Sequence, residues 1–274
     1  MSMLVVNFLD IGSLDCGEVL SLFGSPLSAI DVAQEEARVA ARRLRYGAAS
    51  SYHVGQAVYF HRQLSRPQRV IPRLLQEGAI ALNLFLIDPQ LQDAKTAALR
   101  ELAGKLPNLA VYPLRAAVND QPGFSFAKLY LTRSGDPLGS SLFAGKHNVD
   151  AGRFDRVPCM NLVELVRSIE EECAVCRGAC NILRINAEGV EFALLKSMEA
   201  AGYLRHFRLF MGSGHDLRKV DKALYAQYLQ FLDEHGISFV EFKASDRKQA
   251  VQAVRLVEQQ ITGLLGGSSQ PARH

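Results

Sequence analysis

The sequence ILRINAEGVEFALLKSM, residues 182–198, contains the change of hydrophobic pattern that decides the fold. It begins with a short apolar run that ends at Asn186, and an acidic corner with Glu188 and Gly189 follows. From Val190 onward, apolar residues recur at every fourth position. A continuous apolar run followed by a spacing near 3.6 residues is typical of a β-strand that leads into an α-helix.

The corner of this stretch has two interpretations. In an open α/β sheet, ligands bind at the carboxyl ends of the strands, so Asn186 and Glu188 are well placed for chemistry. Alternatively, Asn186 caps the helix, and Glu188 and Glu191 stabilise its positive N-terminal end. The stretch alone leaves both interpretations open.

The rest of the chain repeats the same alternation of strand and helix. We expect strands over 3–9, 79–87, 109–114, 124–131, 156–160, 182–185, 206–211 and 237–242, and helices over 28–46, 67–77, 89–106, 161–172, 190–198, from about 215 to 234, and 245–264. Pro89 is expected to open the third of these helices, because proline is tolerated in a first turn. This alternation predicts an α/β fold with a mainly parallel sheet covered by helices on both faces.

The length of 274 residues suits one large domain. The gap from Asp10 to Asp88 exceeds the roughly 30 residues that a strand–helix–strand unit needs. We therefore expect a single domain over 1–265, with 25–78 inserted as a lid or cap. Residues 266–274 are expected to be a disordered tail.

Composition narrows the class of protein. A net charge of +3 is too small to indicate a nucleic-acid or membrane-surface partner. No apolar run approaches the roughly 20 residues of a membrane span. The apolar N-terminus lacks the basic region of a secretion signal, so a cytoplasmic protein is expected. The sequence leaves the oligomeric state open.

Polar residues follow the first two predicted strands. Asp10 and Gly12 come after the first strand, where glycine lets backbone N–H groups approach a ligand. The spacing matches neither a dinucleotide fingerprint nor a P-loop. Asp88 follows the second strand, and its two oxygens are able to accept hydrogen bonds from both hydroxyls of a ribose. The alternative is that Asp88 caps the following helix.

Three of the five cysteines form a cluster, Cys173, Cys176 and Cys180, with the spacing C-x2-C-x3-C. Such a cluster is able to bind zinc or iron–sulfur. A closed zinc site needs four ligands, however, and an iron–sulfur cluster needs three or four. Cys159 supplies a fourth only if the fold brings it near. Reduced thiols in a loop ahead of a strand are the alternative.

Five segments resemble, in the same order, motifs of the FkbM-type family of S-adenosylmethionine (SAM) dependent methyltransferases. The resemblance, which also includes the first loop, covers roughly residues 5–212. The segments are 84–90 (LFLIDPQ), 117–123 (AVNDQPG), 139–142 (GSSL), 157–162 (VPCMNL) and the opening stretch, where the family has Leu-Lys-Ile-Asp-x-Glu-Gly-x-Glu.

The chain departs from this family at several positions. In the first loop, Leu14 replaces the family's asparagine, and the second glycine falls one position late, at Gly17. In the opening stretch, Arg184 replaces lysine and Asn186 replaces aspartate. The C-terminal region also lacks a clear seventh strand, which such folds usually have.

The resemblance implies a Rossmann-like class I methyltransferase fold and an O-methyltransferase that uses SAM. Its implied acceptor is a hydroxyl of a sugar or other small molecule, or of a glycan. Asp10 and Gly12 would hold the amino-acid end of SAM and Asp88 its ribose. The resemblance places Asn119 and Asp120 near the adenine.

The catalytic residues are expected at the carboxyl ends of the later strands of the sheet. Asn186 and Glu188 would face the methyl group or the acceptor. His215 is the proposed general base, because imidazole titrates near neutrality and the residue follows a strand in a glycine-rich loop. His53 and His61 are alternatives.

Two other functions fit the sequence. The irregular first loop and the asparagine at 186 favour a catalytically silent methyltransferase-like protein that binds SAM or a partner. The cysteine cluster Cys173, Cys176 and Cys180 favours a metal-binding protein.

Overall fold

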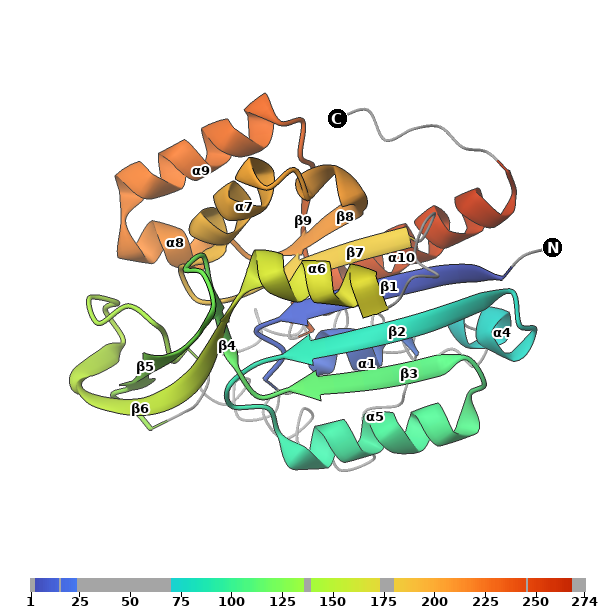
Figure 1. Ribbon diagram of the computed structural model, residues 1–274, viewed down its shortest axis with the longest axis horizontal. Helices are drawn as coiled ribbons and strands as arrows, with labels where there is room; N and C mark the ends of the chain where they lie inside the picture. Colours follow the sequence, from blue (N-terminus) through green and yellow to red (C-terminus); the bar gives the residue numbers. More distant parts are fainter. Residues whose placement is uncertain are drawn as a thin grey trace, which may run out of the picture.

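The structure is a computed structural model that describes residues 3–14, 16–23, 70–135, 139–172, 180–244 and 246–267. Six strands form one all-parallel sheet in the order β3-β2-β1-β7-β8-β9 (Figure 1). Their bounds are β1 Leu4–Ile11, β2 Ile80–Ile87, β3 Leu109–Leu114, β7 Cys180–Ile185, β8 Phe207–Gly212 and β9 Phe239–Glu241.

The strand order reverses at the centre of the sheet. From β1 the chain moves outward through β2 to β3, and it then returns to β7 on the other side of β1. This arrangement confirms the expected α/β fold with a parallel sheet, and it is Rossmann-like. It does not single out a methyltransferase.

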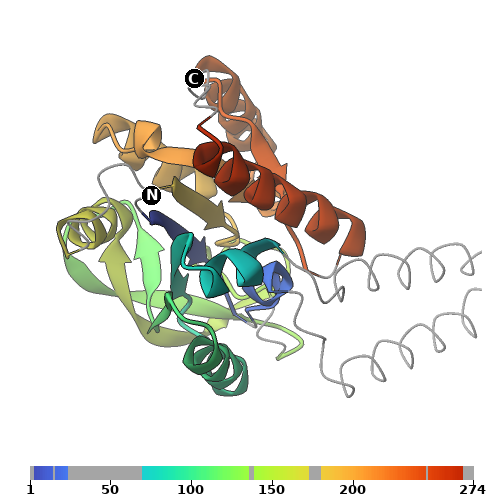
Figure 2. The ribbon, with the colours of Figure 1, turned by 90° about the vertical axis from the view of Figure 1, so that its right-hand side faces the viewer.

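Helices cover both faces of the sheet, as Figures 1 and 2 show. On one face lie α1 (Gly17–Leu22), α4 (Val70–Gln76), α5 (Asp93–Lys105) and α10 (Arg247–Leu265). On the other lie α6 (Leu162–Glu172), α7 (Glu191–Ala200) and α9 (Lys222–Glu234). Each face has its own hydrophobic core, which explains why the central strands read as continuous apolar runs.

A ladder of asparagine side chains crosses three neighbouring strands. Asn83 donates to Asn7 at 2.9 Å, and Asn7 donates to Asn181 at 2.9 Å. Asn181 in turn donates to the carbonyl of His206 at 3.0 Å. These residues lie opposite each other in the register, so the amides satisfy one another and the polar groups are tolerated next to the core.

A second, smaller sheet of three strands in the order β4-β6-β5 was not expected. It consists of β4 Ala117–Asn119, β5 Phe124–Thr132 and β6 Val149–Asn161, and β5 and β6 form a long antiparallel pair. Of its strands, the sequence predicted β5, over 124–131, but only a short strand over 156–160 in place of the long β6. Residues 151–156 are all exposed, so no alternation of buried and exposed positions marks them in the sequence.

Two helix predictions need correction. Pro89 does not open a helix: it lies in a turn, and α5 begins only at Asp93. The predicted helix that ends near 234 is two helices, α8 (His215–Val220) and α9. Asp221 separates them because its side chain accepts hydrogen bonds from the first backbone N–H groups of α9.

The predicted insertion over 25–78 is described only in its last part. There α4 packs Ile71 and Leu75 into the core on one face of the sheet. The predicted helix over 28–46 and the histidines His53 and His61 lie outside the described residues, as does most of the 266–274 tail.

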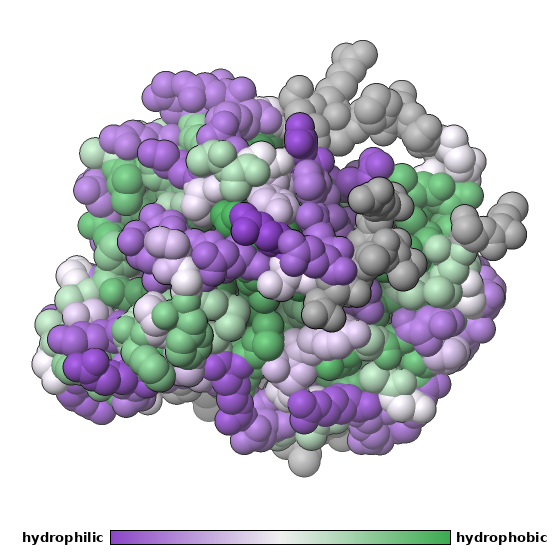
Figure 3. All heavy atoms as spheres, viewed as in Figure 1, coloured by the Kyte–Doolittle hydropathy of each residue, from purple (hydrophilic) through white to green (hydrophobic). Residues whose placement is uncertain are grey.

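The surface on the face of α6 is mixed in character. Figure 3 shows a hydrophilic band over α6 and a more hydrophobic strip beside it, along β2 and β3. Tyr112 on β3 is exposed, and its ring stacks on Phe85 with centroids 4.9 Å apart.

Among the helices that the structure describes, none combines the length and the apolar character that a membrane span requires.

Candidate functional site

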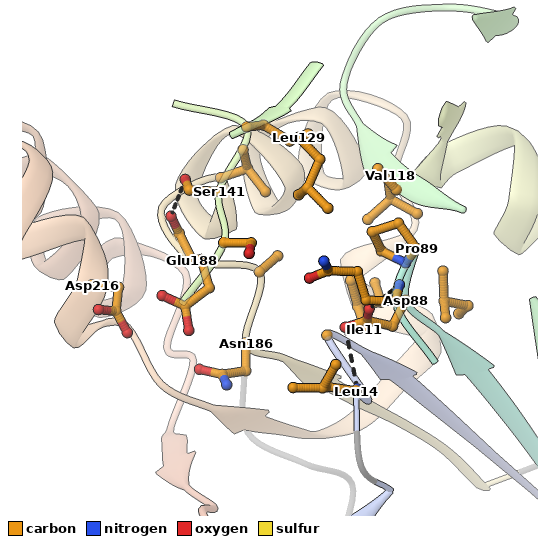
Figure 4. A pocket seen from close by; sticks show the side chains of 18 of the residues that line it. Ile11, Leu14, Asp88, Pro89, Val118, Leu129, Ser141, Asn186, Glu188 and Asp216 are labelled. Carbon is orange, nitrogen blue, oxygen red and sulfur yellow. Dashed lines mark hydrogen bonds between the residues drawn. The ribbon is translucent and has the colours of Figure 1, made fainter. Parts of the chain in front are cut away.

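A cavity of about 390 Å³ lies at the carboxyl ends of the strands, where the strand order reverses between β1 and β7. Ligands of open α/β sheets bind at such a switch point. Figure 4 shows Asp88, Pro89 and Leu14 on one side of the cavity, and Glu188, Asp216 and Ser141 on the other. The cavity therefore has one carboxylate, Asp88, on one side and two carboxylates, Glu188 and Asp216, on the other.

Gly12 fits its position because the strand ends are tightly joined. Its N–H donates to the carbonyl of Ile87 at 2.8 Å, and the N–H of Asn186 donates to the carbonyl of Ile11 at 2.8 Å. Gly12 has φ +82°, and a Cβ there would lie 2.1 Å from the backbone oxygen of Asn186. Any side chain would push β1 and β7 apart at the floor of the cavity.

Asp88, which the sequence predicted to bind a ribose, lies at the tip of β2 and lines the cavity. One of its oxygens accepts from the N–H of Gln90 at 2.7 Å, and the other accepts from the N–H of Leu14 at 3.2 Å. Burial raises the pKa of Asp88 above its ordinary value, while these two hydrogen bonds oppose that shift. Asp88 thus fixes the first loop and does not cap α5, whose N-cap is Gln92.

Asp10 does not line the cavity. It is fully buried, and its carboxylate binds Arg184 and accepts a hydrogen bond from the hydroxyl of Ser13. Arg184 also pairs with Glu18 at 2.9 Å, and both of these residues line the cavity. The structure therefore places Arg184 and Glu18 at the position where the sequence suggested Asp10.

Asn119 and Asp120 lie outside the cavity lining. Asn119 accepts from the N–H of Gln121 at 3.2 Å, and Asp120 accepts from the side chain of Gln121 at 3.1 Å. The preceding residues, Ala117 and Val118, line the cavity instead, together with Leu129. This wall is apolar.

Asn186 and Glu188, the residues predicted to face the methyl group or the acceptor, both line the cavity. The side-chain oxygen of Asn186 is buried and has no hydrogen-bond partner among the described residues. Asn186 does not cap α7, because Val190 holds the N-cap position and provides no side-chain hydrogen bond. The helix-cap interpretation of Asn186 is therefore wrong.

Glu188, Asp216 and Lys243 line the polar end of the cavity near the tips of β7 and β8, and two further lysines pair with the carboxylates from outside the lining. Glu188 pairs with Lys146, whose ammonium also lies 3.8 Å from Asp216. Asp216 pairs with Lys219 at 2.8 Å. Burial raises the pKa of Asp216, but the hydrogen bond from Lys219 and the charge of Lys146 outweigh it and lower the pKa below its ordinary value.

Sequence reasoning missed Lys146, which comes from a loop with no distinctive pattern, and Asp216, which lies in the first turn of the short helix α8. Arg184 did carry a signal: a charged residue interrupts the apolar run of Ile182, Leu183 and Ile185 on a central strand. A buried charge needs a partner of opposite sign, and Asp10 and Glu18 fill that need.

Glu191 lies beneath the polar end and is fully buried. One of its oxygens accepts from the N–H of Gly189 at 2.9 Å, and the other has no hydrogen-bond partner within the part of the chain that the structure describes. Burial raises the pKa of Glu191 to about 7, and the nearby charges of Glu188 and Asp216 contribute in the same direction.

The remaining predicted groups are only partly described. His215 begins α8 beside Asp216, and its side chain lies outside the description. Cys173 and Cys176 also lie outside it. Cys180 is buried in one core, where burial raises the pKa of its thiol to about 11, and Cys159 packs in a separate cluster. Across the described ranges, no group of three metal-ligating side chains comes together.

Four of the five segments that carry the family resemblance supply residues to the cavity. These are the segments that begin at residues 84, 117, 139 and 182. Comparisons with protein-family models, with curated proteins and with solved structures gave no match to this chain.

Proposed function

We propose that this protein is a SAM-dependent methyltransferase that transfers a methyl group to a hydroxyl of a small-molecule or glycan acceptor. One observation carries the proposal: the Asp88 carboxylate, at the tip of the second strand, opens into a cavity at the switch point of a Rossmann-like sheet. The convergence of four distant motif segments on that cavity supports it.

The cavity suits a cofactor of this kind. Its volume falls at the lower end of the roughly 300–1,000 Å³ typical of small-molecule sites. Each oxygen of Asp88 accepts one backbone hydrogen bond and keeps a second lone pair for a ribose hydroxyl. The apolar wall of Val118 and Leu129 suits a flat base. Gly12 leaves backbone room beside the first loop.

The proposed methyl transfer requires few chemical steps from the protein itself. SAM, when bound, supplies an electrophilic methyl group on a sulfonium. The protein has to orient the acceptor hydroxyl and take up its proton. Asn186 and Glu188 face the cavity with hydrogen-bond acceptors suited to holding a hydroxyl. His215 beside Asp216 is the group proposed to take the proton.

A second function, cofactor binding without catalysis, has one observation in its favour. The Asp10 carboxylate, which the family resemblance assigns to the cofactor, is fully engaged with Arg184 and Ser13. In that case the cavity would bind its ligand but support no methyl transfer.

Calorimetric titration with SAM and with S-adenosylhomocysteine tests the proposal. We expect micromolar affinity in the wild type and a loss of about 100-fold or more in Asp88→Ala, because two hydrogen bonds to a charged group contribute about 1.5–3 kcal/mol each. Asp233→Ala, an exposed carboxylate on α9, is the matched control and should bind normally.

NAD⁺ belongs in the same titration series, because a Rossmann-like sheet with an acidic residue at the second strand also suits a dinucleotide. Binding of NAD⁺ with no binding of SAM would overturn the proposal. Asp120→Ala adds a further distinction: unchanged affinity is expected, since Asp120 lies outside the cavity lining.

A further inference from the structure

Glu188 has an unusual backbone conformation for a residue with a side chain. Its φ is +58°, in the left-handed region, and the next residue, Gly189, has φ +120°. A side chain in this region costs free energy because its Cβ crowds the backbone. Such strain persists only where the surrounding structure holds the residue in place, and it is common at functional sites.

Three separate interactions hold Glu188. Its backbone carbonyl accepts from the hydroxyl of Ser141 at 2.9 Å. The N–H that follows it, on Gly189, donates to Glu191 at 2.9 Å. Its carboxylate pairs with Lys146. The carbonyl, the next amide and the side chain of this residue are therefore all fixed.

The holding groups are themselves immobilised. The Lys146 side chain is 1% exposed, and its ammonium also donates to the carbonyl of Gly139 at 3.1 Å. The Ser141 hydroxyl accepts from the N–H of Phe143 at 3.1 Å. Gly189 is enclosed as well, since a Cβ there would lie 3.2 Å from Phe143.

A buried lysine and a strained corner are costly ways to hold a carboxylate, and they are unnecessary where its direction does not matter. The Glu188 side chain retains 22% exposure, and it faces the cavity opposite Asp88 (Figure 4). The carboxylate that is held in this way is therefore one that a ligand is able to reach.

The charges at this end of the cavity limit which ligand group is able to bind Glu188. Glu188 and Asp216 pair with Lys146 and Lys219, and Lys243, which lines the cavity, adds a further positive charge near Asp216. A cationic group would have to compete with Lys146 for the Glu188 carboxylate, and an anionic group would have to approach that carboxylate directly. A neutral hydroxyl, which donates a hydrogen bond without bringing charge, suits this end best.

We propose that Lys146, Ser141 and Glu191 form a positioning clamp that fixes the Glu188 carboxylate to receive a hydrogen bond from a neutral, hydroxyl-bearing acceptor. The identity of the acceptor rests on the proposed function, whereas the clamp itself does not. The two parts are therefore tested separately.

Thermal unfolding of Glu188→Gly and Glu188→Ala tests the clamp. Glycine is relaxed at this φ and alanine is not, so the glycine variant should melt about 2–4 °C above the alanine variant. The neighbouring Ala187 provides the control, because Ala187→Gly should lower the melting temperature at a residue whose φ is not positive. An alanine variant that melts at or above the glycine variant would overturn the clamp.

Binding of glucose, glucosamine and glucuronate tests the ligand class, because these probes differ mainly in charge. Nuclear magnetic resonance titration is done with and without S-adenosylhomocysteine. We expect glucose to bind at least several-fold more tightly than the two charged probes. Preference for glucosamine or glucuronate, or no binding of any probe, would contradict the neutral class.

Variants of Glu191 distinguish a role in positioning the Glu188 carboxylate from a role in stabilising the fold. Glu191→Ala removes the acceptor for the Gly189 N–H, whereas Glu191→Gln keeps it. Glucose affinity should fall about 10-fold in the alanine variant and recover in the glutamine variant, with unchanged affinity for S-adenosylhomocysteine. Equal losses in both variants would refute a positioning role. Absence of cofactor binding in the wild type would refute the methyltransferase alone, since the melting order does not depend on it.

Discussion

Glu191 is a buried residue beside the site whose charge depends on pH. It is fully buried beneath Glu188 and Asp216, and no described residue forms a hydrogen bond with one of its oxygens. Burial raises its pKa from 4.5 to about 7. The residue therefore changes charge near neutrality, close to the two carboxylates that line the cavity.

This shift makes stability depend on pH in a defined direction. Between about pH 4.5 and pH 7, the folded state keeps a proton on Glu191 that the unfolded chain loses. Unfolding therefore releases a proton, and the Glu191 contribution to stability falls as pH rises through this window. Glu191→Gln removes the effect, because its amide is uncharged at every pH.

Urea unfolding at pH 5 and at pH 8 measures this contribution. Relative to the wild type, Glu191→Gln should gain on the order of 1–3 kcal/mol in unfolding free energy between the two conditions. Glu199→Gln, an exposed position on the same helix, is the control and should show no such gain. The same pH dependence in Glu191→Gln and the wild type would exclude Glu191 as its source.

At the scale of elements, Arg184 joins parts of the chain that are far apart in sequence. From β7 it pairs with Asp10 on β1 and with Glu18 on α1. It also donates to the carbonyls of Gly12 at 3.3 Å and Phe242 at 3.4 Å. The first loop and the segment after β9 are thus held against the same guanidinium.

Removal of this guanidinium should be costly. Arg184→Met leaves two buried carboxylates without their cation, and the loss of one partner from a buried ion pair costs about 3–5 kcal/mol. We expect a decrease of this size in unfolding free energy, measured by urea denaturation.

The double variant Asp10→Asn with Arg184→Met is expected to recover part of that loss, because one buried charge is then removed. Arg73→Met is the control, since Arg73 is exposed and pairs with the exposed Glu77. A loss below about 1 kcal/mol in Arg184→Met would show that the carboxylates are satisfied in another way.

At the scale of the whole molecule, stability is unevenly distributed. The central strands β1 and β7 are covered on both faces and joined to neighbours on both edges. The pair β5–β6 extends from a smaller core, and residues 151–156 are exposed. Phe124 and Phe126 on β5 are also exposed.

Hydrogen exchange should reproduce this distribution. Backbone amides of β1 and β7 are expected to exchange only through global unfolding, whereas those of residues 151–156 exchange through local opening at least about 100-fold faster. Mass spectrometry of peptic peptides measures both sets in one experiment. Equal protection would show that the β5–β6 pair unfolds together with the main sheet.

The sequence by itself determined the α/β class, the strands β1, β2, β3, β5, β7, β8 and β9, and the placement of Asp88, Asn186 and Glu188 at strand ends. These features depend on local hydrophobic period and on the rule that parallel strands end at one edge. The exposed part of β6 escaped prediction because solvent on both sides leaves no apolar period to detect.

Only the tertiary structure decided which groups face the cavity. It buried Asp10 behind Arg184, moved Asn119 and Asp120 outside the lining, and brought Lys146 and Asp216 to Glu188. These outcomes depend on pairings between residues that are 42 to 174 positions apart. Charge pairing and desolvation act through space, so no local spacing in the chain records them.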